Sequence, residues 1–172
     1  MLERGTMGEL IDIFRQELSS TFVTGDWQVA LTRLCLACFF GAIIGFEREW
    51  KGKAAGMRTH IIVSMAACLF TLVAFEIVQT AEVGAATGAL RLDPLRLIEG
   101  VTAGVAFLGA GTIIVSTKKV HGLTTAAGMW LSGAVGLAVG IGQAGLAVMA
   151  TALAIIVLEP LKWLEKSLGD DR

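Results

Sequence analysis

Charged residues are scarce in this 172-residue chain, and that shortage already excludes an ordinary soluble domain. Asp, Glu, Lys and Arg make up 17% of the residues, whereas alanine, the larger apolar residues and cysteine make up 55%, before the 21 glycines are counted. Soluble domains carry about a quarter charged residues. The composition therefore predicts an integral membrane protein. The net charge of −1 and the lack of any block of like charges give no sign of nucleic-acid binding.

The motifs of common enzymes are also missing. The sequence has no phosphate-binding loop, no nucleophile elbow and no metal-hydrolase motif. The three cysteines, Cys35, Cys38 and Cys68, all lie inside apolar runs, which is typical of small core residues rather than of metal ligands or disulfides. We therefore expect neither an enzyme nor a cofactor.

Long apolar runs supply the membrane-crossing segments. A helix needs about 20 mostly apolar residues to cross a bilayer, and the runs at 28–46, 59–80 and 95–115 have that length. Asp93-Pro94 is a favourable start for the third run, because aspartate caps helices and proline suits their first turn. The final run, 124–158, is too long for one crossing, so it forms either two short spans or a re-entrant hairpin.

The expected fold class is all-α, a polytopic integral membrane protein with about five transmembrane helices. Residues 1–26 carry apolar side chains at helical spacing with charge opposite, which predicts an N-terminal amphipathic helix at the membrane interface. An untethered terminus is the alternative. Residues 27–159 form the transmembrane domain, and residues 160–172 form a short cytoplasmic tail.

Basic residues are distributed unevenly between the two sides of this topology. One side holds nine of them, namely Arg48, Lys51, Lys53, Arg58, Lys118, Lys119, Lys162, Lys166 and Arg172. The other side holds Arg4, Arg15, Arg91 and Arg96, and Arg33 lies within the first span. The positive-inside rule places the richer side in the cytoplasm, so the N-terminus lies outside and the C-terminus inside.

Five short motifs follow one another in a fixed order. They are GAIIGFERE (41–49), AGMRTH (55–60), DPLR (93–96), FLGAGTI (107–113) and HGLTTAAGMW (121–130). This order resembles the membrane domain of the MgtC/SapB family over about residues 30–158. The match has one departure, since Ala106 stands where the family pattern has glycine. Some members carry a C-terminal ACT-like domain; we expect none here, so regulation attributed to that domain is not carried over.

The resemblance implies a bacterial inner-membrane protein linked to magnesium homeostasis, growth in low Mg²⁺, and survival inside host cells and virulence. It implies a non-enzymatic regulatory factor that modulates F-type ATP synthase or the membrane potential. The alternative is a transporter or channel for Mg²⁺ or another ion, because charge within a membrane span marks ion paths by default. The partners expected are the lipid bilayer, further copies of the chain and a membrane complex such as F-type ATP synthase.

Polar residues at the ends of the spans are the candidate functional residues. Glu47, Arg48 and Arg58 adjoin apolar runs, where arginine can pair bidentately with a carboxylate, whereas Lys51 and Lys53 are interpreted as loop residues. The whole predicted polar network is Arg33, Glu47, Arg48, Arg58, Thr59, Asp93, Arg96, Glu99, His121, Thr124 and Thr125. Thr124 is interpreted as a helix cap.

Magnesium prefers oxygen ligands, commonly carboxylates. In the expected topology Glu47 and Glu49 lie inside, while Asp93 and Glu99 lie outside, so the four cannot form one site. This arrangement counts against a site built only to hold magnesium. If the protein binds a metal ion at all, we expect that ion to be Mg²⁺. Arg33 and Glu99 lie at similar depth in the first and third spans, which predicts that they face one another, with Arg96 as a competitor for the carboxylate.

Small residues recur at helical spacing and predict close helix packing, with a glycine-lined permeation path as the alternative. The positions are Gly41, Gly45, Gly109, Gly111, Gly128, Ser132, Gly136 and Gly140. Because such faces need partners, we also expect a homo-oligomer.

The charge asymmetry predicts that the C-terminus is cytoplasmic. A reporter fused after Arg172 that is active only in the cytoplasm should therefore be active, and a reporter active only outside the cell should be silent. The reverse result would contradict both the orientation and the number of spans.

Overall fold

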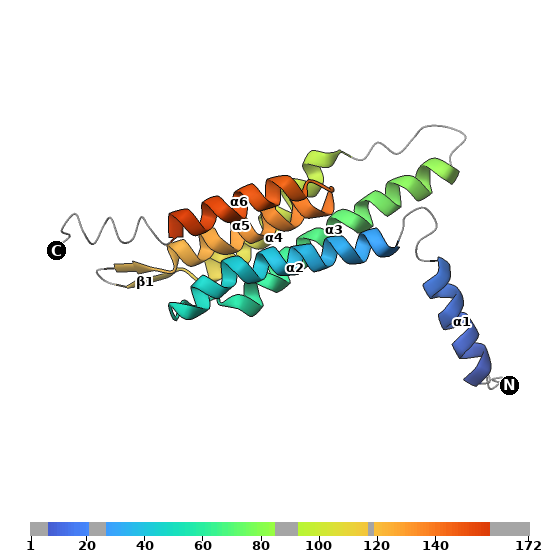
Figure 1. The fold of residues 1–172 in the computed structure, drawn as a ribbon, viewed down its shortest axis with the longest axis horizontal. Coiled ribbons are helices and arrows are strands. Elements are labelled where there is room, and N and C mark those ends of the chain that lie inside the picture. The colour runs from blue at the N-terminus through green and yellow to red at the C-terminus, as the bar shows by residue number, and fades with distance from the viewer. Residues whose placement is uncertain (1–6, 21–26, 85–92, 117–118, 159–172) are drawn as a thin grey trace.

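The computed structural model describes residues 7–20, 27–84, 93–116 and 119–158, which form six helices and one hairpin (Figure 1). The elements are α1 (Met7–Ser20), α2 (Trp27–Trp50), α3 (Met57–Gly84), α4 (Pro94–Gly111), β1 (Ile114–Ser116), β2 (Lys119–His121), α5 (Leu123–Gly140) and α6 (Ala144–Leu158). The tail predicted at 160–172 lies outside the described residues. Helices α2 to α6 form one bundle, and α1 lies apart from it beside the start of α2.

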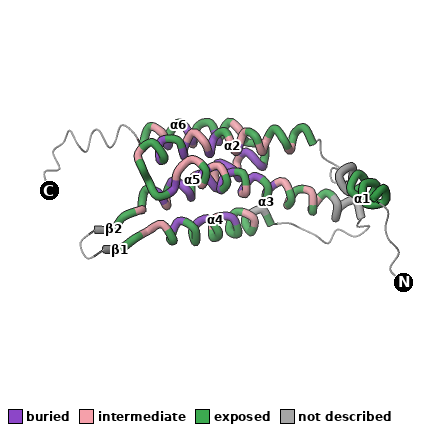
Figure 2. Tube along the Cα trace, turned by 90° about the horizontal axis from the view of Figure 1, so that it is seen from below, coloured by how far each residue is buried: buried purple, intermediate pink, exposed green. Residues whose placement is uncertain are grey.

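The predicted all-α membrane fold is confirmed. By length and composition, three helices in the described part of the chain are able to cross a membrane, namely Trp27–Trp50, Met57–Gln79 and Leu123–Gly140, and α6 is a shorter apolar helix. Exposed residues occur along every helix of the bundle (Figure 2). Many of them are large and apolar, as expected for a surface that faces lipid. The predicted N-terminal amphipathic segment is helical as α1, and Leu10, Ile11, Ile13 and Phe14 on it are exposed.

Helix α5 is the centre of the bundle, because it contacts α2, α3, α4 and α6. Small residues on α5 explain this position. A Cβ at Gly136 would clash with the Ser64 carbonyl oxygen, and one at Gly140 would lie 2.6 Å from Thr71 Cβ. Helix α3 therefore approaches the α5 backbone to a distance that only glycine allows.

Glycines also allow α2 to pack closely against α3. A Cβ at Gly41 would lie 2.8 Å from the His60 carbonyl oxygen, and one at Gly45 would lie 2.6 Å from Met57 Cα. By contrast, a Cβ at Gly109 would make ordinary contact with Ala126 at 3.4 Å, and Gly111 has open space around it. Of the eight small-residue positions, Gly41, Gly45, Gly136 and Gly140 thus need glycine, and Gly109 and Gly111 do not. Ser132 already carries a side chain, and a Cβ at Gly128 would lie 3.1 Å from His60 Nε2.

The segment between α4 and α5 is a two-stranded antiparallel hairpin, which the sequence reading missed. Val115 pairs with Val120, and β-branched residues of this kind favour strands. Gly122 ends the hairpin at φ 90°, and it is the N-cap residue of α5, with no side-chain cap. The prediction that Thr124 caps this helix is therefore wrong, because the helix begins one residue earlier and Thr124 is exposed in its first turn.

The turn between α5 and α6 lies beside the middle of α3, so these two helices reach less far along the bundle than α3 does. It runs through Gly142 at φ 84° and lies level with Thr71, which contacts Gly140. Helix α3 continues from Thr71 to Gly84, about 20 Å farther at 1.5 Å per residue. The α5–α6 turn therefore ends well within the length of α3, as Figure 1 shows.

Glycine at the α3–α5 contact should be indispensable. Gly136→Ala is expected to lower the free energy of unfolding by about 2 kcal/mol or more, because the α3 backbone must move away. Gly104→Ala is the matched control, since Gly104 lies in α4 with nothing within 4 Å of its Cβ position and gains about 0.5–1 kcal/mol of helix propensity. Denaturant unfolding in detergent measures both, and equal effects would contradict the close contact.

Candidate functional site

A buried ion pair lies at the C-terminal end of α2. Glu47 and Arg48 are 6% and 3% exposed, and Arg48 Nε donates to Glu47 Oε2. Lys51 Nζ lies 2.7 Å from Glu47 Oε1, one turn along the chain. Both oxygens of the carboxylate are therefore paired with cations. Burial follows from Gly41 and Gly45, which let the start of α3 cover this end of α2.

The pairing of Lys51 corrects the interpretation of this lysine as a plain loop residue. Its side chain is 20% exposed and belongs to the ion-pair network, whereas Lys53 is exposed. Arg58, which the sequence placed in the same network, is exposed on the first turn of α3. The structure brings Glu47 and Arg48 together but does not bring Arg58 to them.

Glu49 performs a different task from Glu47, although only two residues separate them. Its Oε2 accepts the backbone N–H of Met57 at 2.8 Å, at the first residue of α3. A carboxylate there satisfies one of the free N–H groups of a helix start and interacts favourably with the helix dipole. Gly56 leaves room for it, since a Cβ at Gly56 would lie 2.9 Å from Glu49 Oε2.

Arg33 lies at the opposite end of the α2–α5 contact. Its Nη1 donates to the Gly140 carbonyl oxygen at 2.8 Å, so the guanidinium caps the C-terminal end of α5. Glu99 is exposed on α4 and makes no ion pair with any described residue. The predicted Arg33–Glu99 pair is therefore wrong. Similar depth of Arg33 and Glu99 in the membrane did not predict the partner of Arg33, because the guanidinium instead reaches the carbonyl groups at the end of α5.

The other predicted polar residues are spread over the bundle. Asp93 caps α4, accepting the Leu95 N–H at 3.0 Å, and Pro94 occupies the first helical position, as the sequence predicts. Arg96 is exposed on α4, and His121 is exposed on β2. Thr125 is buried at 3% exposure on α5.

The buried polar residues on α3 are not predicted from the sequence. Ser132, a buried polar residue of α5, is assigned from the sequence to helix packing alone. His60, Ser64 and Thr71 are 0% exposed, as is Ser132. His60 Nδ1 donates to the Gly56 carbonyl oxygen at 2.8 Å, while its Nε2 and the hydroxyls of Ser64 and Ser132 have no partner among the described residues. An unsatisfied buried polar group costs about 1–3 kcal/mol. The spacing of four and seven residues between His60, Ser64 and Thr71, which places them on one face of α3, was the signal that was available.

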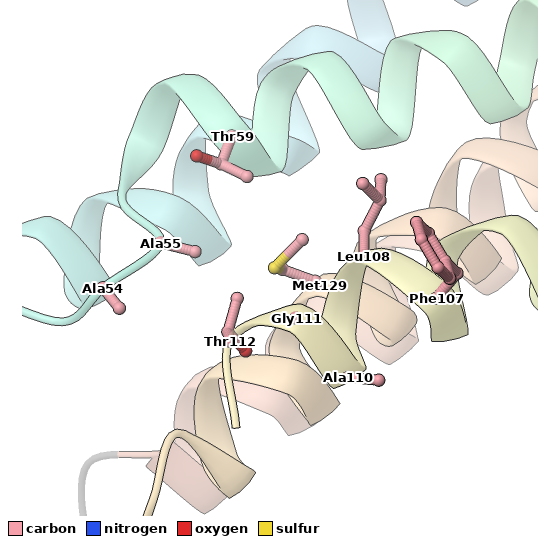
Figure 3. A pocket seen from close by; sticks show the side chains of 9 residues that line it. All are labelled: Ala54, Ala55, Thr59, Phe107, Leu108, Ala110, Gly111, Thr112 and Met129. Atoms are coloured by element: carbon pink, nitrogen blue, oxygen red, sulfur yellow. The ribbon is translucent and has the colours of Figure 1, made fainter. Parts of the chain in front are cut away.

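Two surface pockets adjoin this end of the bundle. One of about 500 Å³ lies between the loop after α2, the start of α3 and the end of α4, and Thr59 and Met129 line it (Figure 3). The other, of about 630 Å³, lies beside α2 and α6, and Glu47 and Trp50 are among its lining residues. In the described part of the chain, no three His, Cys, Asp or Glu side chains lie close enough together to hold a metal ion.

The apolar helices, their glycine contacts and the buried ion pair at one end are together those of a helical membrane protein. The model of the MgtC family matches residues 34–167, which is most of the chain. The chain therefore belongs to the MgtC family.

Three curated relatives match three quarters or more of the chain, each with 37% or 38% identical residues. Protein SrpB of Synechococcus elongatus is 38% identical over 150 residues, which are 83% of this chain and 80% of SrpB. YhiD of Escherichia coli K12 is 37% identical over 133 residues, 75% of this chain and 59% of YhiD. Protein MgtC of Brucella abortus strain 2308 is 37% identical over 138 residues, 77% of this chain and 53% of MgtC. The chain thus matches little more than half the length of the latter two. No solved structure matches it.

Removing the anion of the buried pair should destabilise the bundle. Glu47→Ala leaves Arg48 buried without its partner, which is expected to cost about 3–5 kcal/mol of the free energy of unfolding. Glu99→Ala removes an exposed glutamate of α4 and should change stability little.

Unfolding in detergent by denaturant compares the two glutamate variants directly. The double variant Glu47→Ala, Arg48→Ala should recover part of the loss, because no unpaired charge remains. A Glu47→Ala protein as stable as Glu99→Ala would show that the pair does not hold this end of the bundle together.

Proposed function

We propose that this protein is a regulatory factor of the bacterial inner membrane that supports growth when magnesium is scarce. In this proposal the N-terminus lies outside and the C-terminus in the cytoplasm, so the Glu47–Arg48 pair lies at the cytoplasmic surface. The protein acts by contact with a membrane complex such as F-type ATP synthase, or through the membrane potential, and it assembles as a homo-oligomer. The same activity supports survival inside host cells and virulence.

The observation that carries this proposal is the state of Glu47. It is a buried carboxylate at the predicted cytoplasmic end of a span, and Arg48 and Lys51 already occupy both of its oxygens. A magnesium ion binds to free carboxylate oxygens. A neutralised pair instead supports a shape-determining role, in which the loop before α3 and the two adjoining pockets form a surface for a partner.

A second candidate function is transport of Mg²⁺ or another ion. The name given to YhiD of Escherichia coli proposes magnesium transport for that relative. The feature that favours it here is Arg33, a charged side chain within a span that caps a helix ending inside the bundle. Helix ends at membrane depth are where many transporters bind ions.

A flux measurement separates the two candidates. The purified full chain is reconstituted in proteoliposomes that contain a magnesium-sensitive dye. As a regulator the protein should leave magnesium entry at the rate of empty liposomes and should co-purify with a membrane complex from its host. Magnesium entry that depends on the protein and is abolished by Arg33→Ala would overturn the proposal in favour of transport.

Growth in low magnesium tests which residues carry the function. Glu47→Ala should abolish growth support, because it breaks the buried pair. Arg58→Ala should also abolish it, because Arg58 is exposed next to Thr59 of the 500 Å³ pocket, where a partner can reach it. Lys53→Ala should not, because Lys53 lines neither pocket. Lys51→Ala should reduce it, since it removes one of the two cations paired with Glu47. Protein levels in the membrane are measured in parallel. If all four variants support growth equally, this end of the bundle is not the functional site.

A further inference from the structure

The contact between α3 and α5 contains polar atoms that no described group satisfies. His60 and Ser64 lie one turn apart on α3, and Ser132 lies one turn beyond Gly128 on α5. All three side chains are 0% exposed, and His60 Nε2 and both serine Oγ atoms have no hydrogen-bond partner among the described residues. Buried polar groups of this kind are normally satisfied by an ordered water or a ligand.

The tautomer of His60 follows from its other ring nitrogen. Nδ1 lies 2.8 Å from the Gly56 carbonyl oxygen, and a carbonyl only accepts hydrogen bonds, so Nδ1 carries the proton. In the neutral ring, Nε2 then has a free lone pair. A Cβ at Gly128 would lie 3.1 Å from this nitrogen. The lone pair therefore points into the α3–α5 contact, where α5 has no side chain.

The two serines differ from hydroxyl residues elsewhere in the bundle. Thr71 donates to the Ala67 carbonyl oxygen at 2.8 Å, and Thr102 donates to that of Ile98 at 2.6 Å, each one turn back in its own helix. Ser64 and Ser132 make no such bond. Their hydroxyl groups can thus donate to, and accept from, a molecule in the contact. One lone pair and two hydroxyls match the roughly three hydrogen bonds that a buried water makes.

The 500 Å³ pocket lies at the same level of the bundle. Thr59 and Met129 line it, and they are the chain neighbours of His60 and Gly128 (Figure 3). The pocket therefore adjoins the turn of α3 that carries the unsatisfied Nε2 of His60 and the turn of α5 that carries Gly128.

The charged groups around His60 come from the end of α2. Arg48 and Glu47 are the charged neighbours of the ring, and the Glu49 carboxylate accepts the N–H of Met57, the first residue of α3. Helix α5 contains no Asp, Glu, His, Lys or Arg, so it brings no charged group to this contact. The charges of α4, Arg96 and Glu99, lie in its first two turns, away from its Gly111 end at the pocket.

We propose that His60, Ser64 and Ser132 form a buried water- and proton-binding site, with His60 Nε2 as the proton acceptor. A hydronium ion that enters through the pocket transfers its proton to the Nε2 lone pair and becomes water, and the ring becomes a cation with both nitrogens protonated. Nε2–H then donates to the bound water or a serine oxygen. The new charge lies beside Arg48, which it repels, and Glu47, which it attracts, so proton binding acts on the buried ion pair.

Nitrogen NMR of the full chain in lipid nanodiscs tests this site. The chain has two histidines, so a protein labelled with nitrogen-15 at histidine gives signals of His60 and the exposed His121 alone, and His121→Gln assigns them. We expect His60 to be the Nδ1–H tautomer, to receive magnetisation from water at Nε2, and to become doubly protonated as the pH is lowered. Absence of both water transfer and titration at His60 would overturn the proposal.

Serine variants test the site by a second route. Ser64→Ala and Ser132→Ala should each shift the Nε2 resonance and its titration midpoint, and the loss of a water contact should lower the melting temperature. Thr102→Ala is the control, because its hydroxyl bonds within α4. Melting temperatures that rise in the serine variants, with an unchanged Nε2 signal, would show that the serines are dry and unrelated to His60. These readouts do not depend on growth or magnesium flux, so they are independent of the proposed regulatory function.

Discussion

The close approach of α3 to the backbones of α2 and α5 is the constraint on which the rest of the bundle depends. Gly41 and Gly45 admit it on one side, and Gly136 and Gly140 on the other. In a bilayer, apolar side chains gain little by leaving lipid for another helix, so close packing and interhelical hydrogen bonds supply the attraction. Helix α3 is therefore held between two glycine faces, and its inward side chains are buried in these contacts.

That burial explains why polar residues at one end of the bundle lie where they do. With α3 covering the end of α2, Glu47 and Arg48 are enclosed and compensate one another. Glu49, two residues later, lies on the rim and caps α3 instead. His60, directly within the glycine contacts, is enclosed from both sides. The ion pair, the cap and the histidine are thus consequences of a single packing arrangement.

The end of the bundle opposite the Glu47–Arg48 pair is organised around Arg33. Helices α5 and α6 turn back level with the middle of α3, and Arg33 closes the carbonyl end of α5. A helix that ends inside a bundle leaves backbone carbonyls unpaired, and in lipid these need a donor. Arg33 supplies that donor, which accounts for a charged residue in an otherwise apolar span. Its position is explained by α5 rather than by the carboxylate of Glu99.

The sequence by itself determined the helical membrane class, most helix limits to within a few residues, the Asp93 cap and the family, because hydropathy, capping residues and ordered motifs are local properties of the chain. The structure alone decided that Arg33 pairs with a backbone carbonyl, that Lys51 joins the ion pair while Arg58 does not, and that His60 lies beside two unsatisfied serines. Periodicity tells which residues share a helix face but not which face of another helix they meet. That choice depends on how closely the backbones approach, and the glycines of α2 and α5 that face α3 determine it only once the helices are assembled.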